Sequence, residues 1–147
     1  MLRCRLNEEN GWLTEPDVVL DFGDRGIVVI EAKLTSQNEE QKAGYGGWLR
    51  YLNGIAFRDQ QLARSSGLYQ LVRNWRLGFE LAGKRPLLLI NLARIFDREE
   101  RRKLAMLRAS LCLSVHHRFR LRNWEQICAT VPPSDWVIDY CRKPRVN

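Results

Sequence analysis

The stretch from Glu15 to Leu34, EPDVVLDFGDRGIVVIEAKL, constrains the fold of this chain more than any other segment. Two runs of β-branched and aromatic residues, 18–22 and 27–30, lie on either side of the glycine-bounded turn GDRG. This pattern predicts two strands joined in a hairpin. The apolar residues explain the strands, but they do not explain the charged residues at the strand ends, which are Asp17, Glu31 and Lys33.

The length of the turn decides whether these three charges meet. A three-residue loop that ends at Gly26, with Gly26 in the left-handed conformation, places Asp17 opposite Lys33. Because side chains alternate along a strand, Asp17 then shares a face with Glu31. A two-residue loop instead places Asp17 opposite Ala32 and turns its side chain to the other face. The charges therefore converge only if the loop has an odd number of residues or a bulge intervenes.

Convergence of the charges would create a site for a cation. Two carboxylates a few ångströms apart repel each other at neutral pH, unless a cation lies between them or one of them is protonated. Oxygen ligands favour a hard ion, Mg²⁺ or Mn²⁺. A lysine beside the ion can hold an attacking water or stabilise the charge of a phosphate. These are the components that hydrolysis of a phosphodiester needs.

The pair Pro16-Asp17, followed by Glu31-Ala32-Lys33, resembles the signature of the PD-(D/E)XK nuclease superfamily, which has the restriction-endonuclease-like fold. The resemblance covers the chain from about Thr14 to Leu92 and includes the strand, turn and strand setting of the motif. The core of this family usually begins with a helix that supplies another metal-binding glutamate. Little chain precedes the first strand here, so we expect that helix to be short or missing.

The resemblance implies roles for five residues. Asp17 and Glu31 would bind the divalent metal together with the backbone carbonyl of Ala32. Lys33 would orient or activate the hydrolytic water. Family members often add a glutamine from the helix that follows, and Gln70 is the best match to that position. Without a first-helix glutamate the domain is pared down, or binds metal more weakly, or has its site completed by a partner subunit such as the second copy of a homodimer.

The rest of the chain alternates helices and strands. Apolar residues at helical spacing predict a helix over 67–83, with Ser65 or Ser66 as its N-cap and Gly83 as its stop. The run PLLLINL predicts a buried strand, and RFRLR predicts a further one. Capping signatures begin two more helices, at Asp97 with Glu100 and at Asn123 with Gln126.

This order predicts one α/β domain over residues 1–147, with a mixed central sheet flanked by helices. The restriction-endonuclease-like core would span about 14–92, and a helical, basic part would span 97–147. No tract resembles a linker or an internal repeat.

Basic residues exceed acidic ones, with 24 Lys and Arg against 17 Asp and Glu and a formal net charge of +7. Such a balance suits a polyanionic partner, and we expect nucleic acid, DNA in particular. The charged helix face at 98–108 is either a solvated surface or a phosphate-contacting one, with Arg118, Arg120 and Arg122 nearby in sequence. Trp48 and Tyr51, in a glycine-containing segment, are candidates to contact the substrate.

Several classes of protein are disfavoured. No window approaches the roughly 18 consecutive apolar residues of a membrane span, and the start of the chain lacks the apolar core of an export signal. We therefore expect a cytoplasmic protein that does not enter a membrane. The cysteines are scattered without a C-x-x-C pair, which indicates free thiols rather than a zinc site. His116 and His117 are adjacent, so on a strand they point to opposite faces and cannot chelate together.

The expected function is metal-dependent hydrolysis of nucleic-acid phosphodiester bonds. The alternative is a catalytically weak or inactive module of the same fold, which binds nucleic acid or assembles with a partner. A third class, a protein-interaction domain unrelated to nucleic acid, would bind neither DNA nor Mg²⁺.

Overall fold

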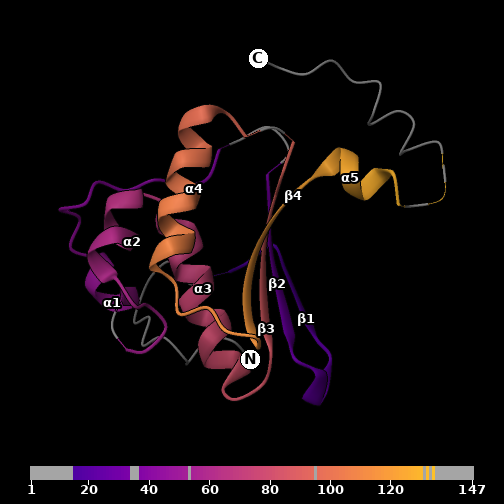
Figure 1. Cartoon of the computed structure of the whole chain (residues 1–147), viewed down its shortest axis with the longest axis horizontal. Coiled ribbons are helices and arrows are strands. Elements are labelled where there is room, and N and C mark those ends of the chain that lie inside the picture. Colours follow the sequence, from indigo (N-terminus) through magenta and orange to yellow (C-terminus); the bar gives the residue numbers. More distant parts are fainter. Residues whose placement is uncertain are drawn as a thin grey trace.

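A four-stranded mixed sheet forms the centre of the molecule. The structure, a computed structural model, describes residues 15–33, 37–52, 54–94, 96–130, 132 and 134. Strands β1 (Val18–Asp21), β2 (Ile27–Lys33), β3 (Leu87–Ala93) and β4 (His117–Asn123) are ordered β1-β2-β3-β4 (Figure 1). β1 runs antiparallel to β2, whereas β2, β3 and β4 are parallel. The expected α/β class with a mixed sheet and flanking helices is confirmed, and β4 is the strand expected at RFRLR.

The crossover helices lie on one side of this sheet. They are α1 (Trp48–Leu52), α2 (Gln60–Ser66) and α3 (Tyr69–Ala82) between β2 and β3, and α4 (Arg98–Ser110) between β3 and β4. Because the strand order never reverses, two right-handed crossovers must place their helices on the same face. Figure 1 shows α1 to α4 together on that side, with α5 (Trp124–Cys128) continuing from the end of β4. The other side of the sheet, called the open face below, carries no crossover helix.

The hairpin between β1 and β2 has an odd-numbered loop. Phe22 N–H donates to the carbonyl of Gly26 at 2.9 Å, and a 3₁₀ turn, Gly23–Arg25, lies between them. The loop, Gly23–Arg25, therefore begins one residue earlier than predicted. It starts at Gly23, with a φ of 61°, and is followed by Gly26, with a φ of 118°. A Cβ on Gly26 would collide with the backbone carbonyl of Pro86, so a side chain is excluded there by contact as well as by conformation.

This loop changes the predicted register by two residues. Val18 lies opposite Ile30 and Asp21 opposite Ile27, so extending the ladder by one residue brings Asp17 opposite Glu31 rather than Lys33. The expectation of Asp17 opposite Lys33 is therefore wrong. A shift of two residues preserves the face on which a side chain lies. The expectation that the three charges share one face is consistent with this register.

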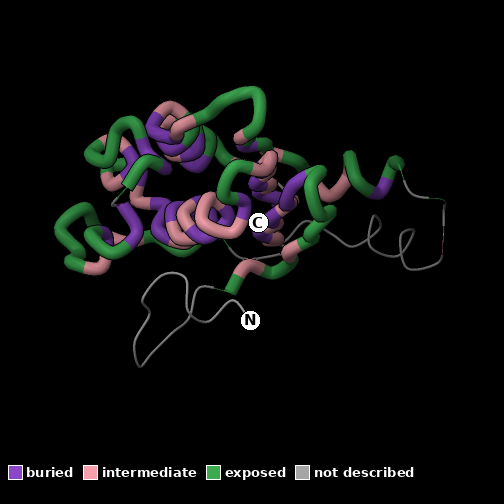
Figure 2. The backbone as a smooth tube through the Cα atoms, turned by 90° about the horizontal axis from the view of Figure 1, so that it is seen from below, coloured by how far each residue is buried: buried purple, intermediate pink, exposed green. Residues whose placement is uncertain are grey.

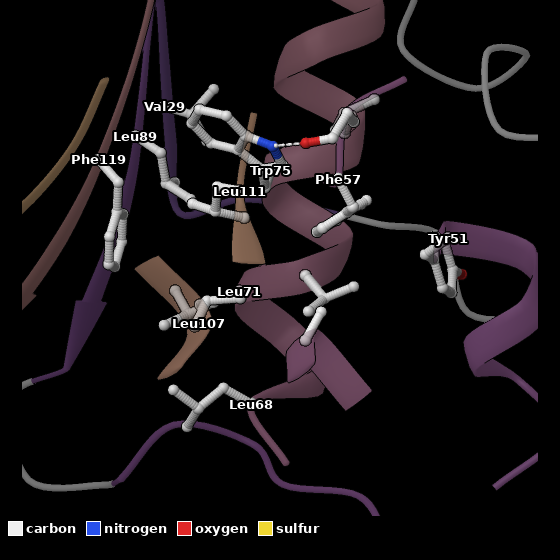
Figure 3. Packing of buried hydrophobic residues seen from close by; sticks show 14 of the residues in the cluster. Val29, Tyr51, Phe57, Leu68, Leu71, Trp75, Leu89, Leu107, Leu111 and Phe119 are labelled. Atoms are coloured by element: carbon white, nitrogen blue, oxygen red, sulfur yellow. Dashed lines mark hydrogen bonds between the residues drawn. The ribbon is translucent and has the colours of Figure 1, made fainter. Parts of the chain in front are cut away.

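The core fills the space between the sheet and α3. Val29, Leu89 and Phe119 point from the strands toward Leu71 and Trp75 of α3 (Figure 3). Figure 2 shows the buried residues gathered between the helices and the strands, with exposed residues on the loops. The helix approaches the sheet closely because of a glycine in its centre. A Cβ on that residue, Gly78, would lie 2.8 Å from the Cδ1 of Leu87 and 3.2 Å from the Cγ2 of Val29.

Most predicted helix boundaries are confirmed. Gly83 ends α3, the Asp97 side chain caps α4, and Asn123 and Gln126 form a reciprocal capping box on α5. The N-cap predicted for α3 is wrong, because Ser65 and Ser66 are the last two residues of α2. Gly67, at a φ of 75°, ends α2 in the left-handed conformation and separates it from α3.

Some expectations concern residues that the structure does not describe. The first core helix would precede Glu15, so its absence or shortness lies outside the described residues, as do Cys4 and Cys141. Cys112 is a free thiol, and Cys128 is buried. None of the described helices combines the length and the apolar character required to cross a membrane.

Candidate functional site

A buried carboxylate lies where β2 approaches its carboxyl end. Glu31 and Lys33 follow Ile27 and Val29 on the face of β2 that packs against α3, and the Glu31 side chain is 0% exposed. Lys33 Nζ lies 2.5 Å from Glu31 Oε1. From α3, Asn74 Nδ2 donates to Glu31 Oε2 at 2.7 Å. Both carboxylate oxygens are therefore engaged, one by a cation and one by an amide.

Asp17 lies at the start of the neighbouring strand. Its side chain is exposed, and its Oδ2 accepts a hydrogen bond from the backbone N–H of Ala32 at 2.7 Å. Burial raises the pKa of Glu31, and the negative charge of Asp17 raises it further, while Lys33 and Asn74 act in the opposite direction. The structure thus brings Asp17, Glu31 and Lys33 together, as the odd-numbered loop requires.

The backbone carbonyl of Ala32 lies at the same point. Ile27 N–H donates to the carbonyl of Pro86, on the β3 side, so the odd-numbered residues of β2 direct their backbone groups toward β3. The even-numbered residues, including Ala32, direct theirs toward β1. By register the residue opposite Ala32 is Pro16, which has no N–H to donate to the Ala32 carbonyl. The proline before Asp17 therefore leaves one carbonyl oxygen without a ladder partner beside the two carboxylates.

Two asparagines in the site were missed by sequence reasoning. Asn74 lies one helical turn after Gln70, the residue predicted to complete the site. Asn91 lies beside Glu31 on β3 and is 0% exposed, and neither its Nδ2 nor its Oδ1 has a hydrogen-bond partner among the described residues. A usable signal was present in the run LLLINLA, where one amide interrupts the apolar residues of a buried strand. Such an orphaned amide is rare in a core and indicates a functional position.

Gln70 points elsewhere in this structure. Its Oε1 accepts a hydrogen bond from the backbone N–H of Glu39 at 3.5 Å, and its own N–H donates to the Glu39 carbonyl at the same distance. The helix contact to Glu31 comes from Asn74 instead.

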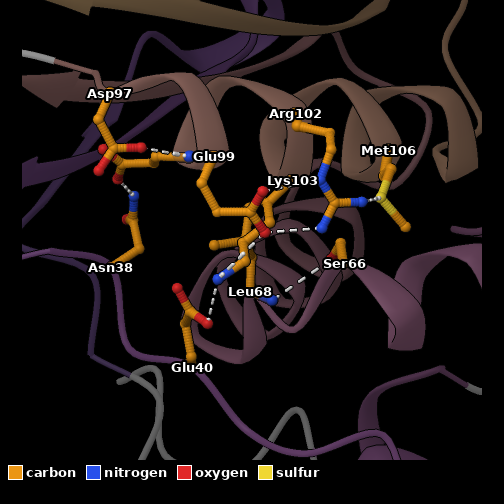
Figure 4. Close-up of polar contacts among 10 residues, drawn as sticks. Asn38, Glu40, Ser66, Leu68, Asp97, Glu99, Arg102, Lys103 and Met106 are labelled. Atoms are coloured by element: carbon orange, nitrogen blue, oxygen red, sulfur yellow. Dashed lines mark hydrogen bonds and ion pairs between the residues drawn. The ribbon is translucent and has the colours of Figure 1, made fainter.

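The segment 37–41, which follows β2, is held against α3 and α4 by polar contacts, and Figure 4 shows those to α4. Glu40 pairs with Lys103 at 2.6 Å, and Asn38 Nδ2 donates to the buried carboxylate of Glu100 at 2.8 Å. Burial raises the pKa of Glu100, and the nearby charges of Asp97 and Glu40 add to this effect. A second buried acid therefore lies at the start of α4, close to the carboxyl end of β3.

The oxygen donors at Glu31 fit a hard divalent ion, although sparsely. Among the residues that the structure describes, no group of three or more His, Cys, Asp and Glu side chains is arranged to hold a metal. The available set is the two carboxylates of Asp17 and Glu31 and the carbonyl of Ala32. Mg²⁺ commonly keeps several waters and uses only one or two carboxylates, so this set meets its minimum requirement.

The predicted aromatic contacts with a substrate are wrong. Trp48 is 0% exposed and Tyr51 is 3% exposed, because both pack edge-on against the ring of Tyr69. Burial, together with the neighbouring tyrosines, raises the pKa of Tyr69. The guanidinium of Arg73 lies 5.6 Å from the ring centres of both Tyr51 and Tyr69. These aromatics belong to the core rather than to a binding surface.

Comparison of the chain with protein-family models, with curated proteins and with solved structures found no match in any of the three.

Proposed function

We propose that this chain is a metal-dependent nuclease with a restriction-endonuclease-like fold, related to the PD-(D/E)XK superfamily, which hydrolyses phosphodiester bonds of nucleic acid. DNA is the expected substrate. The observation that carries the proposal is the convergence of three charges at one edge of the sheet. Glu31 is fully buried beside Lys33, and the charge of Asp17 is close enough to raise the Glu31 pKa.

The buried acid supports a cation-binding role. A carboxylate whose pKa is raised by burial and by a like charge gains from any additional positive charge that reaches it. Asp17, Glu31 and the Ala32 carbonyl would hold Mg²⁺ or Mn²⁺, and the bound ion would supply the charge that polarises a phosphate. Asn74 would keep the Glu31 carboxylate in a fixed orientation through its 2.7 Å hydrogen bond.

Lys33 would act on the water or on the phosphate. Its ammonium is now paired with Glu31 at 2.5 Å. Once Glu31 is neutralised by another cation, Lys33 is free to hold a hydrolytic water or to stabilise the charge that develops on the phosphate oxygens.

The same ion pair favours the second candidate, a catalytically weak or inactive module that binds nucleic acid or assembles with a partner. Lys33 already neutralises Glu31, so metal binding must compete with an existing contact. The donor set also holds only two carboxylates. A module of this kind would bind nucleic acid without measurable affinity for Mg²⁺.

The test is cleavage of supercoiled, linear, branched and single-stranded DNA, and of RNA, in the presence of Mg²⁺ or Mn²⁺. We expect Asp17→Asn, Glu31→Gln and Lys33→Met each to lower the rate by at least about 10²-fold. Asp21→Asn is the matched control, since Asp21 lies at the other end of β1 and pairs with Arg85 at 2.9 Å. It should cut at the wild-type rate.

Three results discriminate between the candidates. Cleavage that all three site variants retain would remove the proposed catalytic roles. A wild-type chain that cuts none of the substrates would end the nuclease proposal. Calorimetry with Mg²⁺ then decides the second candidate, because an inactive module should show no metal binding that Glu31→Gln abolishes.

A further inference from the structure

Three arginines form a row along β4. Arg118, Arg120 and Arg122 occupy alternate positions and are all exposed, whereas Phe119 between them is 2% exposed. Phe119 is in register with Leu89 and faces the helices with it. The arginines therefore lie on the open face of the sheet, which no crossover helix covers. Exposure on β1 agrees, since Leu20 of the same face is 42% exposed.

The charge of this row is uncompensated among the described residues. Arg118 Nε donates to the carbonyl of Val115 at 3.2 Å and Arg122 to that of Leu121 at 3.0 Å, and none of the three arginines forms an ion pair with a described acid. The sequence from Leu111 to Trp124 contains no acidic residue. On the adjacent strand the same face carries apolar residues, which are Leu88, Ile90 and Leu92.

The basic face of α4 differs in this respect. There Arg102 pairs with Glu99 at 2.7 Å and Lys103 pairs with Glu40 at 2.6 Å (Figure 4). Acids interleave the bases on that helix, as expected of a solvated surface. The two basic segments thus lie on opposite sides of the sheet. On α4 two of the basic residues are paired with described acids, whereas none of the three arginines of the β4 row is.

The row also ends at the edge of the sheet where the candidate site lies, on the opposite face from the side chains of Glu31 and Lys33. Alternate residues of a strand are about 6.6 Å apart, so three long side chains along β4 can reach several phosphates of one strand. Arg122 is in register with Leu92, which is in register with Ala32. Since neighbouring strands are separated by about 4.8 Å, the axis of β4 lies about 10 Å from that of β2. The end of the row and the charged end of β2 thus lie at the same edge of the sheet.

We propose that Arg118, Arg120 and Arg122 contact the phosphate backbone of the nucleic acid that this chain binds, and lead it to the carboxyl edge of the sheet. The substrate class in this inference rests on the proposed function. Guanidinium groups suit phosphates because they donate two parallel hydrogen bonds to them. Charges on an edge strand also prevent pairing between sheets, but that role needs no affinity for nucleic acid.

The experiment measures binding rather than cleavage. Fluorescence anisotropy with a labelled DNA duplex, in chelator and over a series of salt concentrations, gives the slope of log affinity against log salt. Each phosphate contact contributes about 0.9 to that slope on duplex DNA. We expect the triple variant Arg118→Gln, Arg120→Gln and Arg122→Gln to lower the slope by about 2 to 3. The matched variant Arg98→Gln, Arg101→Gln and Arg108→Gln removes the same charge from exposed positions of α4 and should change the slope by less than about 1.

Two results would overturn the inference. Equal changes of slope in both triple variants would show that only net charge matters, and a wild-type chain that binds no duplex at low salt would remove the partner itself. If the row binds an acidic protein or a second copy of this chain instead, the wild type would show this absence of duplex binding. Because the measurement is made without metal, binding that depends on the β4 row but is not followed by cleavage would refute the proposed nuclease and leave this inference standing.

Discussion

The interface between α3 and the sheet changes from apolar to polar over two residues along β2 and β3. At one end Val29 of β2 lies beneath the helix near Gly78, and Leu89 of β3 is in register with it; both are 0% exposed. Two residues further, the equivalent positions are Glu31 and Asn91, equally buried, with Asn74 above them. We call these the apolar end and the polar end.

The two ends contribute to stability with opposite sign. Burial of apolar side chains stabilises the fold in proportion to the area removed from water. The buried carboxylate of Glu31, and the Asn91 amide that lacks partners among the described residues, destabilise it, because their lost hydration is replaced only in part. Stability is therefore generated at the apolar end, while the polar end retains groups whose presence packing alone does not explain. Such local violations of packing rules are characteristic of functional positions.

The largest expected effect is at the apolar end. Leu89→Ala should lower the free energy of unfolding by about 2 to 5 kcal/mol, because it removes a fully buried side chain and leaves a cavity. Denaturant unfolding followed by tryptophan fluorescence measures the change. Leu88→Ala, on the open face of the same strand, should cost clearly less. Equal losses at the two positions would mean that the interface with α3 does not dominate the core.

At the polar end the hydrogen bond to Glu31 is the most sensitive contact. Asn74→Leu keeps a similar volume but removes the donor to a buried charged group, and should cost about 1.5 to 3 kcal/mol at neutral pH. Gln70→Leu, one turn earlier on α3, is the control and should cost less, because Gln70 meets only a backbone N–H at 3.5 Å. If Asn74→Leu were neutral, the Glu31 carboxylate would not depend on this amide.

A substitution in the opposite direction should stabilise the protein. Asn91→Leu removes two buried polar atoms that lack partners in the described part of the chain, and puts an apolar side chain of similar volume in their place. We expect a gain of about 1 kcal/mol in the free energy of unfolding. A loss of similar size would show instead that the amide of Asn91 is satisfied in solution, by a bound water or an ion.

The smallest effect is a dependence on pH at the second buried acid. Because burial raises the pKa of Glu100 above that of the unfolded chain, the folded protein binds more protons in the interval between the two values. Stability from this group is greatest below the unfolded pKa and declines as pH rises through the folded one. Relative to Glu100→Gln, the wild type should therefore gain stability as pH falls from neutral. A difference in stability between the wild type and Glu100→Gln that stays constant with pH would contradict the raised pKa.

Sequence reasoning succeeded where the signal was local. The hairpin, the strand at RFRLR and the caps at Asp97 and Asn123 each depend on residues a few positions apart, and the structure has all of them. It failed over Trp48 and Tyr51, since glycines in their neighbourhood indicated an exposed loop, whereas α1 packs its aromatic rings onto Tyr69. That packing depends on a contact between separate helices.

By itself, the sequence determined that Glu31 and Lys33 share a face of one strand, because side-chain alternation is a property of the backbone. It also limited Asp17 to two outcomes, set by an odd or an even loop. The tertiary structure decided between them, through a turn whose second glycine must fit against Pro86, the residue before β3. Tertiary contact likewise selected Asn74 and Asn91 as the neighbours of Glu31, because burial and partners arise only when distant segments pack together.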